Sequence, residues 1–466
     1  MKILLVSPSQ FRVYGKFSAP AFPSLSLGYL ATVLEKAGHQ VRIIDIDAEK
    51  MSGQDFVKEL INENFGLVGI TTSTPTFNEA IYLADVVKGN SKAFTVLGGV
   101  HVSVMPDEAI KYKSVDFVVK GEGERTIVEL AECLEGRKDL ETVDGLYYRQ
   151  DGKIVKNKDR ELISDLDAIP FPARHLYKNN IYTYPDTLTT PVFPIVTSRG
   201  CPAHCSYCAT NSIFKHKFRA RSPKNVVDEL ELLVKDFKAK EIHVWDDNFI
   251  FIKSRIIEIK DEIKKRSLKL KFAFPDGVRV DCVDEELLKA LKEMGTYSIA
   301  FGIESGSQYT LNKVNKGLRL GRVEEVFRLA RRLGMEIWAF FIIGLPDENE
   351  KRIKETIAFA KKINPDVAKF HILKPYPGTR VYDEFLANSL IIDHNFDNYG
   401  IHTPPVHRLK DLTADQILYW QRRAYKSFYL RPSILMRHVC RLKSINRLKS
   451  NFIIGKDILL KSLIKR

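Results

Sequence analysis

The sequence alternates between short β-branched runs and helical patterns, and this alternation constrains the fold most. In the first third of the chain, five such runs predict strands at 2–6, 41–44, 67–71, 94–97 and 116–119. Apolar residues recur at helical spacing between them, over 25–37, 53–64, 76–88 and 124–135. Alternating strands and helices are typical of an α/β domain with a parallel sheet.

A second series of strands and helices follows in the middle of the chain. Its expected strands lie near 192–197, 241–245, 271–275, 297–302, 337–343 and 368–373, and its helices near 223–237, 253–266, 284–294, 320–333 and 349–363. Six such units are too few to close an eight-fold barrel. Ligands of parallel sheets bind at the carboxyl ends of the strands, so we expect the functional residues there.

Three cysteines follow the first strand of this second series. Cys201, Cys205 and Cys208 form a C-x3-C-x2-C pattern, and their thiolates suit zinc or an iron–sulfur cluster. A structural zinc or an ordinary four-iron cluster takes four protein ligands, whereas three leave one iron of a [4Fe–4S] cluster open. Zinc remains an alternative if His204 or His216 supplies a fourth ligand.

The cysteine spacing resembles the signature of the radical S-adenosylmethionine (SAM) enzymes. The resemblance implies a partial (βα)6 barrel, a [4Fe–4S] cluster on the three cysteines, and SAM chelated by the open iron. Reductive cleavage of SAM would then give a 5′-deoxyadenosyl radical.

The same resemblance implies SAM contacts at the ends of the barrel strands. The candidates are Tyr207 within the motif, Asp246, Asp247 and Asn248 for the amino group, Glu304 with Ser305 for the ribose, and Gly344 for the adenine. Carboxylate and amide oxygens suit an ammonium ion, although Asp246–Phe249 could also be an exposed acidic turn. Arg219 and Arg221 could reach the SAM carboxylate, or merely precede a helix capped by Ser222. Tyr376 and Arg380 are candidates for the substrate side.

The expected strands of the first domain end in glycines and small polar residues. These are Ser73 and Thr74, then Gly98, Gly99 and His101, then Gly121, Glu122, Gly123 and Glu124. In this order, ahead of the cysteines, they resemble the cobalamin-binding domain of cobalamin-dependent radical SAM enzymes. The Asp-x-His-x-x-Gly motif that ligates cobalt elsewhere is absent, so the resemblance implies base-off cobalamin, with His101 as a loop residue. A domain that has lost cobalamin is the alternative.

Composition limits the remaining possibilities. No apolar run approaches the length of a membrane span. Six cysteines, three of them clustered, make no disulfide framework, and an oxygen-sensitive cluster suits a reducing cytoplasm. Only Cys133 lies in the first domain, so a second cluster of the methylthiotransferase type is not expected. We expect four parts: 1–135, a cobalamin-binding-like domain; 136–190, a linker with a hairpin; 191–380, the radical SAM core; and 381–466, a helical extension.

The basic character of the chain belongs to its C-terminal end. Residues 422–466 hold thirteen Lys or Arg and one acid, a net charge of +12, which leaves +2 of the total +14 for all other residues. The basic, amphipathic pattern of 431–466 favours contact with the inner face of a membrane. Packing on the barrel is the alternative, and RNA binding is disfavoured because aromatic residues are sparse.

Together these features predict an enzyme that methylates an unactivated carbon of a lipid-like or other small substrate. Ring formation or rearrangement of an isoprenoid, hopanoid or tetrapyrrole is the alternative, and a non-catalytic cobalamin or lipid sensor is a third. Such chemistry needs an electron donor of the flavodoxin or ferredoxin kind.

Overall fold

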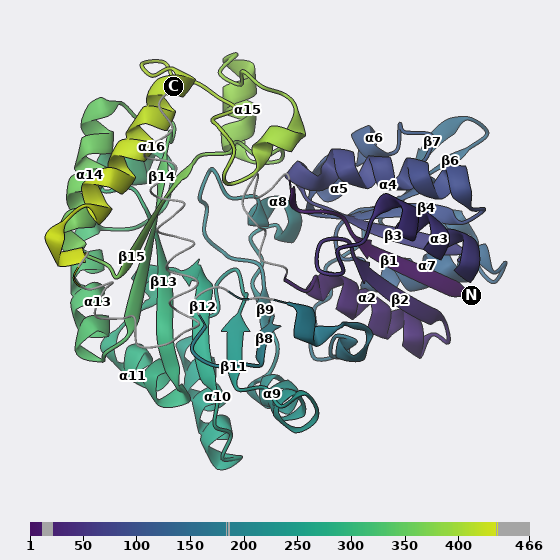
Figure 1. The fold of residues 1–466 in the computed structure, drawn as a ribbon, viewed down its shortest axis with the longest axis horizontal. Coiled ribbons are helices and arrows are strands. Elements are labelled where there is room, and N and C mark those ends of the chain that lie inside the picture. Colours follow the sequence, from purple (N-terminus) through teal and green to yellow (C-terminus); the bar gives the residue numbers. More distant parts are fainter. Residues whose placement is uncertain (12–21, 183, 185–186, 435, 437–466) are drawn as a thin grey trace.

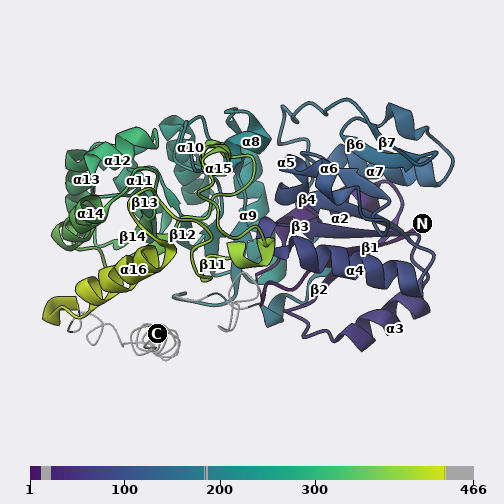
Figure 2. The same cartoon turned by 90° about the horizontal axis from the view of Figure 1, so that it is seen from above.

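Two sheets, one in each half of the chain, form the framework of the protein (Figures 1 and 2). The computed structural model describes residues 1–466 except 12–21, 183, 185–186, 435 and 437–466. Both halves are α/β with parallel strands, which confirms the predicted fold class.

The N-terminal sheet has seven strands in the order β2-β1-β3-β4-β5-β6-β7. They are β1 (Lys2–Ser7), β2 (Gln40–Asp45), β3 (Leu67–Thr72), β4 (Phe94–Gly99), β5 (Phe117–Val119), β6 (Leu146–Gln150) and β7 (Lys153–Lys156). The first five pair in parallel, and β6 and β7 add an antiparallel hairpin at the edge. The hairpin that we expected within a linker is therefore part of this sheet.

Helices cover both faces of the N-terminal sheet. They are α2 (Leu25–Lys36), α3 (Gly53–Glu63), α4 (Phe77–Asn90), α5 (Val100–Val104), α6 (Pro106–Ala109) and α7 (Glu124–Leu134). Strand β1 shows why two layers form: Leu4 and Val6 pack with α3 and α4, whereas Ile3 and Leu5 pack with α2 and α7. A strand buried on both faces is what an apolar run in a parallel sheet predicts.

The second sheet has six parallel strands in the order β15-β14-β13-β12-β11-β8. They are β8 (Val192–Ile195), β11 (Glu241–Val244), β12 (Lys271–Val278), β13 (Thr296–Glu304), β14 (Glu336–Ile343) and β15 (Val367–Ile372). In this order β8 and β15 are the two edges, so the sheet is a partial barrel, as the six units predicted.

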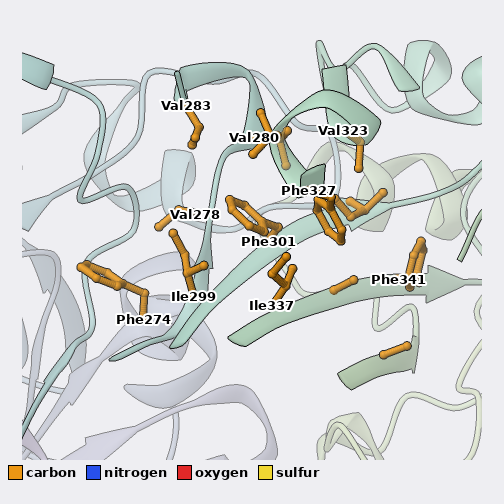
Figure 3. Close-up of a cluster of buried hydrophobic side chains, with 14 of the residues drawn as sticks. Phe274, Val278, Val280, Val283, Ile299, Phe301, Val323, Phe327, Ile337 and Phe341 are labelled. Carbon is orange, nitrogen blue, oxygen red and sulfur yellow. The ribbon is translucent and has the colours of Figure 1, made fainter. Parts of the chain in front are cut away.

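The amphipathic helices that connect successive strands of this sheet pack on its outer face. The chain forms α8 (Thr210–Phe214), α9 (Pro223–Phe237), α10 (Lys253–Lys265), α11 (Glu285–Met294), α12 (Gln308–Lys313), α13 (Leu320–Arg332), α14 (Glu350–Ile363), α15 (Arg380–Ala387) and α16 (Ala414–Tyr429). Figure 3 shows part of the resulting core, where Ile299, Phe301 and Ile337 of the sheet meet Phe327 of α13. Ser222 caps α9, as predicted, and Thr413 caps α16.

Candidate cluster and cofactor site

The three cysteines lie on a loop between β9 (Ser198–Arg199) and α8, beyond the end of β8. All three side chains are half-buried. Gly200 enters the loop with φ +86°, and a Cβ there would lie 2.1 Å from the carbonyl oxygen of Lys217. Only glycine fits this position, because both the backbone angle and the close approach exclude a side chain.

Asp247 braces the cysteine loop. One carboxylate oxygen accepts a hydrogen bond from the Gly200 amide at 2.8 Å, and the other accepts one from the Thr210 hydroxyl at 3.0 Å. Asp247, which we predicted as a SAM contact, therefore also links Gly200 at the start of the cysteine loop to Thr210 at the start of α8.

Two polar side chains point at the sulfurs. The Arg279 guanidinium lies 3.6 Å from the Cys205 Sγ, and the Asn248 amide nitrogen lies 3.9 Å from the Cys201 Sγ. Burial raises the pKa of the Cys201 and Cys208 thiols, and at Cys201 the positive charge of Arg279 acts in the opposite direction. Arg279 has no motif around it, and we did not predict it from the sequence.

The donor set suits a cluster better than a single ion. Within the described part of the chain, no three His, Cys, Asp or Glu side chains are grouped to hold one metal ion. A four-iron cluster needs no such group, because each thiolate binds a different iron. His204 and His216, the candidates for a zinc ligand, stack on each other with ring centroids 4.1 Å apart.

Asp246 is a buried support for the end of the first barrel strand. Its carboxylate accepts hydrogen bonds from the Thr197 amide at 2.6 Å, the Thr197 hydroxyl at 2.6 Å and the Ser198 hydroxyl at 2.5 Å. Burial raises the pKa of this carboxyl despite these donors. We expected Asp246 beside the SAM amino group, but both of its oxygens are already occupied within the protein.

Glu304 lies at the end of β13, in a left-handed conformation with φ +67°. Its carboxylate is 2.7 Å from the Lys316 ammonium, and both side chains are buried. Burial alone would lower the pKa of Lys316, but the Glu304 carboxylate raises it. Glu304 thus lies at the end of the strand where we expected it. Its partner Lys316 was not indicated by any pattern in the sequence.

Three other predicted SAM residues have structural partners. Ser305 is fully buried, and its hydroxyl lies 3.0 Å from that of Thr356. The Gly344 amide donates to Glu348 at 2.7 Å. Tyr207 packs against the barrel core, where burial raises the pKa of its phenol.

The two predicted carboxylate-binding arginines pair with acids of the protein. Arg221 is buried and forms an ion pair with Glu229 of α9. Arg219 donates to both carboxylate oxygens of Glu122, at 2.8 and 3.0 Å. Both guanidinium groups are thus paired within the protein, and the alternative prediction, that the two arginines precede a helix capped by Ser222, agrees with the structure. The sequence did not show which acid lies next to each guanidinium.

At the other domain, glycines leave an open edge at the strand ends. A Cβ on Gly98 or Gly121 would meet no other atom within 4 Å, so both leave room for a large ligand. Gly99 has φ +108°, and a Cβ there would lie 2.5 Å from the Thr72 carbonyl oxygen. Ser73 begins a capped turn in which its amide donates to Thr76 at 2.9 Å. This cradle fits cobalamin.

His101 is a packed residue of the short helix α5. Its ring is fully buried between Phe77 and Phe396, with centroids 4.4 and 4.8 Å away, and its Nδ1 lies 3.2 Å from the Thr74 hydroxyl. Burial lowers its pKa to about 4. This environment fits a packed structural histidine rather than a cobalt ligand, but the residue lies in helix α5 and not in the loop that we expected.

The inner face of the barrel sheet carries charged and aromatic side chains. The Lys369 ammonium lies 4.7 Å from the ring centroid of Trp338 and 5.6 Å from that of Phe340. Asp276 of β12 is solvent-exposed. These residues lacked any sequence signal.

The two predicted substrate-side residues lie near the end of β15. The Tyr376 hydroxyl donates to the Tyr399 carbonyl at 3.0 Å, so the side chain is held within the C-terminal extension. Arg380 begins α15 and is exposed.

Comparison with known families agrees with this arrangement. Residues 13–131 match the family described as B12 binding domain, and residues 195–360 match the Radical SAM superfamily.

Several curated proteins are similar over most of the chain. An uncharacterized methyltransferase of Pyrococcus horikoshii is 36% identical, with 94% of this chain and 95% of that protein covered. The cytidylyl-2-hydroxyethylphosphonate methyltransferase of Streptomyces wedmorensis is 31% identical, with 84% and 82% covered. An anaerobic magnesium-protoporphyrin IX monomethyl ester cyclase of Cereibacter sphaeroides is 29% identical, with 93% and 71% covered.

Solved structures share the fold. The radical SAM methyltransferase TsrM of Kitasatospora setae, with cobalamin and a [4Fe–4S] cluster bound, superposes with a TM-score of 0.74 at 16% identity, covering 99% of both chains. The cobalamin-dependent radical SAM enzyme OxsB, with aqua-cobalamin and SAM bound, gives a TM-score of 0.74 at 19% identity and covers 99% of this chain and 71% of that one.

Proposed function

Because this chain belongs to the cobalamin-dependent radical SAM methyltransferase family, we propose that it methylates an unactivated carbon of a small, polar substrate. One observation carries the proposal most directly. Glu122, next to the open Gly121, contacts Arg199 and Arg219, the two residues that flank the cysteine loop, and this supports cofactor sites that face the same region.

Different residues of the chain would hold the different cofactors. Cys201, Cys205 and Cys208 would hold the cluster, and Gly98 and Gly121 would give cobalamin close access to the backbone. When bound, the cluster, SAM and cobalamin together supply reductive cleavage of SAM and methyl transfer, which the protein side chains alone cannot perform. Asp247 holds the loop in shape, and Arg279 places a positive charge beside Cys205.

The inner face of the barrel supports a substrate with a polar or acidic group. Lys369 provides a cation, and Trp338 and Phe340 provide aromatic surface beside it. A purely hydrocarbon substrate would leave the exposed Asp276 carboxylate against an apolar partner, at a desolvation cost. We therefore favour a polar small molecule over the isoprenoid or hopanoid substrates considered from the sequence.

A second candidate reaction is oxidative ring formation. The observation that favours it is the similarity, over 93% of this chain, to proteins named as cyclases. Both reactions need an external reductant, for which we propose a flavodoxin or ferredoxin.

Peripheral membrane contact through 431–466 remains a proposal from charge alone. All but five of these residues lie outside the described part of the chain. Across the described residues, no helix combines the length and apolar character that crossing a bilayer requires. Sedimentation with vesicles containing anionic lipid, compared for the full chain and a chain ending at 430, tests the contact.

The proposed reaction is tested by anaerobic reconstitution with iron, sulfide and hydroxocobalamin, followed by dithionite and SAM. We expect 5′-deoxyadenosine from the wild type and none from a Cys201→Ala, Cys205→Ala, Cys208→Ala triple variant. Adding a small-molecule extract of the source cells and methyl-deuterated SAM then separates the outcomes. A product that gains a deuterated methyl group supports methylation, and a product that only loses hydrogen supports ring formation and contradicts the proposal.

A further inference from the structure

Four charged side chains connect the cobalamin domain to the cysteine loop. Arg199 donates to Glu122 at 2.8 Å and also pairs with Glu124, and Arg219 donates to both oxygens of Glu122. The two acids follow β5 of the N-terminal sheet, and the two arginines belong to β9 and β10 (Arg219–Ala220). We name these four residues the interdomain clamp.

The clamp is buried, unlike an ordinary surface ion pair. The exposed fractions of the side chains are 5% for Glu122, 8% for Glu124, 15% for Arg199 and 10% for Arg219. Burial acts to raise the pKa of Glu122, but Arg219 and Arg199 hold it below its usual range. Paired guanidinium and carboxylate groups of this kind hold a fixed geometry, because two hydrogen bonds fix direction as well as distance.

Both sides of the clamp are anchored by further contacts. Glu122 also accepts the Ile163 amide at 2.8 Å, from the segment that leads into the barrel. The Arg199 guanidinium lies 5.5 Å from the ring centroid of Tyr29 on α2. Glu124 begins α7, where a carboxylate is favoured by the helix dipole.

The position of the arginines relates the clamp to the cluster loop. Arg199 and Arg219 are direct partners in the antiparallel β9–β10 pair. Arg199 lies two residues before Cys201, so the cysteine loop begins at the clamp. A shift of the acids would therefore be transmitted directly to the base of the loop.

We propose that Glu122 and Glu124 are positioning residues that fix the cobalamin domain against the base of the cysteine loop. We expected these acids to be cobalamin contacts because they stand in the Gly-Glu-Gly-Glu segment. Their carboxylates are instead used by Arg199 and Arg219, and the glycines beside them leave the open edge. The clamp thereby sets the separation of the two cofactor sites.

Hydrogen exchange on the cofactor-free full chain gives the first test, and it holds even if the proposed reaction fails. We expect Glu122→Gln and Glu124→Gln to speed exchange in peptides covering both 161–165 and 198–221. The matched control is Asp159→Asn. It breaks an exposed ion pair with Lys120, the residue directly before the Gly121–Glu124 segment. Wild-type exchange at 198–221 in both clamp variants would overturn the proposal.

The second test measures cofactor position and affinity in the loaded protein. Pulsed electron paramagnetic resonance reports the distance between cob(II)alamin and the reduced cluster, and equilibrium dialysis reports cobalamin affinity. We expect a broadened distance distribution with affinity within about threefold of wild type, since no cobalamin contact is removed. A narrow distribution with affinity reduced about tenfold or more would make the acids cobalamin ligands and overturn the proposal.

Conservative variants distinguish loss of the interdomain clamp from loss of the fold. Arg219→Lys keeps the charge but loses the two-point contact with Glu122, so it should broaden the distance distribution while the far-ultraviolet circular dichroism stays that of wild type. An unchanged distribution in folded Arg219→Lys together with Arg199→Lys would count against the clamp.

Discussion

At the scale of single residues, the structure separates ligand-facing positions from positions that support them. Gly98 and Asp246 illustrate the two kinds. Gly98 has open space beside its Cα, whereas Asp246 is enclosed by Thr197 and Ser198. A substitution at Gly98 should therefore affect cobalamin binding without affecting stability. A substitution at Asp246 should affect the shape of the strand end.

Gly98→Ala tests the cobalamin edge. The added methyl group meets no protein atom within 4 Å, so we expect the free energy of unfolding to change by less than about 0.5 kcal/mol. The same methyl group would occupy the cradle and weaken cobalamin binding by about tenfold. Dialysis against hydroxocobalamin checks this, with Gly89→Ala in α4 as the control that also adds a methyl group in open space. Full affinity in Gly98→Ala would place cobalamin elsewhere.

Glu348 gives a prediction for pH. Its carboxyl is buried beside the β14–α14 turn, and burial raises its pKa from 4.5 to about 8, although the Gly344 and Leu345 amides act in the opposite direction. The folded protein therefore holds this proton more tightly than the unfolded chain. The contribution of the Glu348 carboxyl to the free energy of unfolding is complete below about pH 4.5. It is lost as pH rises towards 8, at up to about 1.4 kcal/mol per pH unit.

Urea unfolding of wild type and Glu348→Gln at pH 5, 6.5 and 8 measures this effect. We expect the stability of the wild type, relative to the variant, to fall across the series. Glu350→Gln, at the exposed first residue of α14, should show no such trend. A constant difference between wild type and Glu348→Gln would show that the carboxyl titrates normally.

At the scale of elements, the order of strands and helices could be predicted, but the partners of charged side chains could not. The helix predicted over 124–135 is observed as Glu124–Leu134, because apolar periodicity is a local property of the sequence. Arg219 pairs with an acid 97 residues away, and no local pattern encodes that contact. Arg279 and Lys316 were missed for the same reason, whereas the cysteines were found because their ligand spacing is local.

Helix α16 illustrates an element whose role appears only in the structure. It packs along β15, and the Tyr429 hydroxyl contacts the Ala368 amide at 3.1 Å and the Ala368 carbonyl at 2.9 Å. The Phe370 amide donates to the Tyr425 hydroxyl at 3.1 Å, and Gln421 donates to the Phe370 carbonyl at 2.8 Å. The helix thus replaces a neighbouring strand at this edge.

Tyr429→Phe should lower the free energy of unfolding by about 1–2 kcal/mol, because buried backbone groups of Ala368 lose their partner. Chemical unfolding measures the loss, and hydrogen exchange at Ala368 should become faster. Tyr419→Phe removes a hydroxyl from an exposed tyrosine of the same helix and serves as the control. Equal stability of the two variants would mean that the edge contacts contribute nothing.

At the scale of the whole molecule, the segment between the domains is built into the barrel rather than lying loosely between them. Arg174, from this segment, is 3.0 Å from Glu229 of α9 and 2.6 Å from the Pro194 carbonyl of β8. Its side chain is 4% exposed and that of Glu229 is 1% exposed. The expected linker 136–190 therefore contributes to both domains.

Arg174→Met should destabilise the barrel by about 3 kcal/mol, because it leaves the buried Glu229 with only Arg221 as a charged partner. Scanning calorimetry should show the loss in the transition of the barrel. Arg42→Met breaks a more exposed pair with Glu59 in the N-terminal domain and should cost less than about 1 kcal/mol. Equal effects of the two variants would show that the Arg174 contact is not part of the barrel's stability.

The contacts of α16 on β15 also bear on how the protein behaves in a crowded solution. An uncovered edge strand is a template on which strands of other chains can add, and this is a common route to aggregation. Tyr425, Tyr429 and Gln421 occupy the outward amide and carbonyl groups at Ala368 and Phe370, so no foreign strand can pair there. A chain shortened before Ala414 would keep its cysteine loop. It would also expose the unpaired backbone groups of β15, and we expect it to precipitate at concentrations at which the full chain stays dissolved.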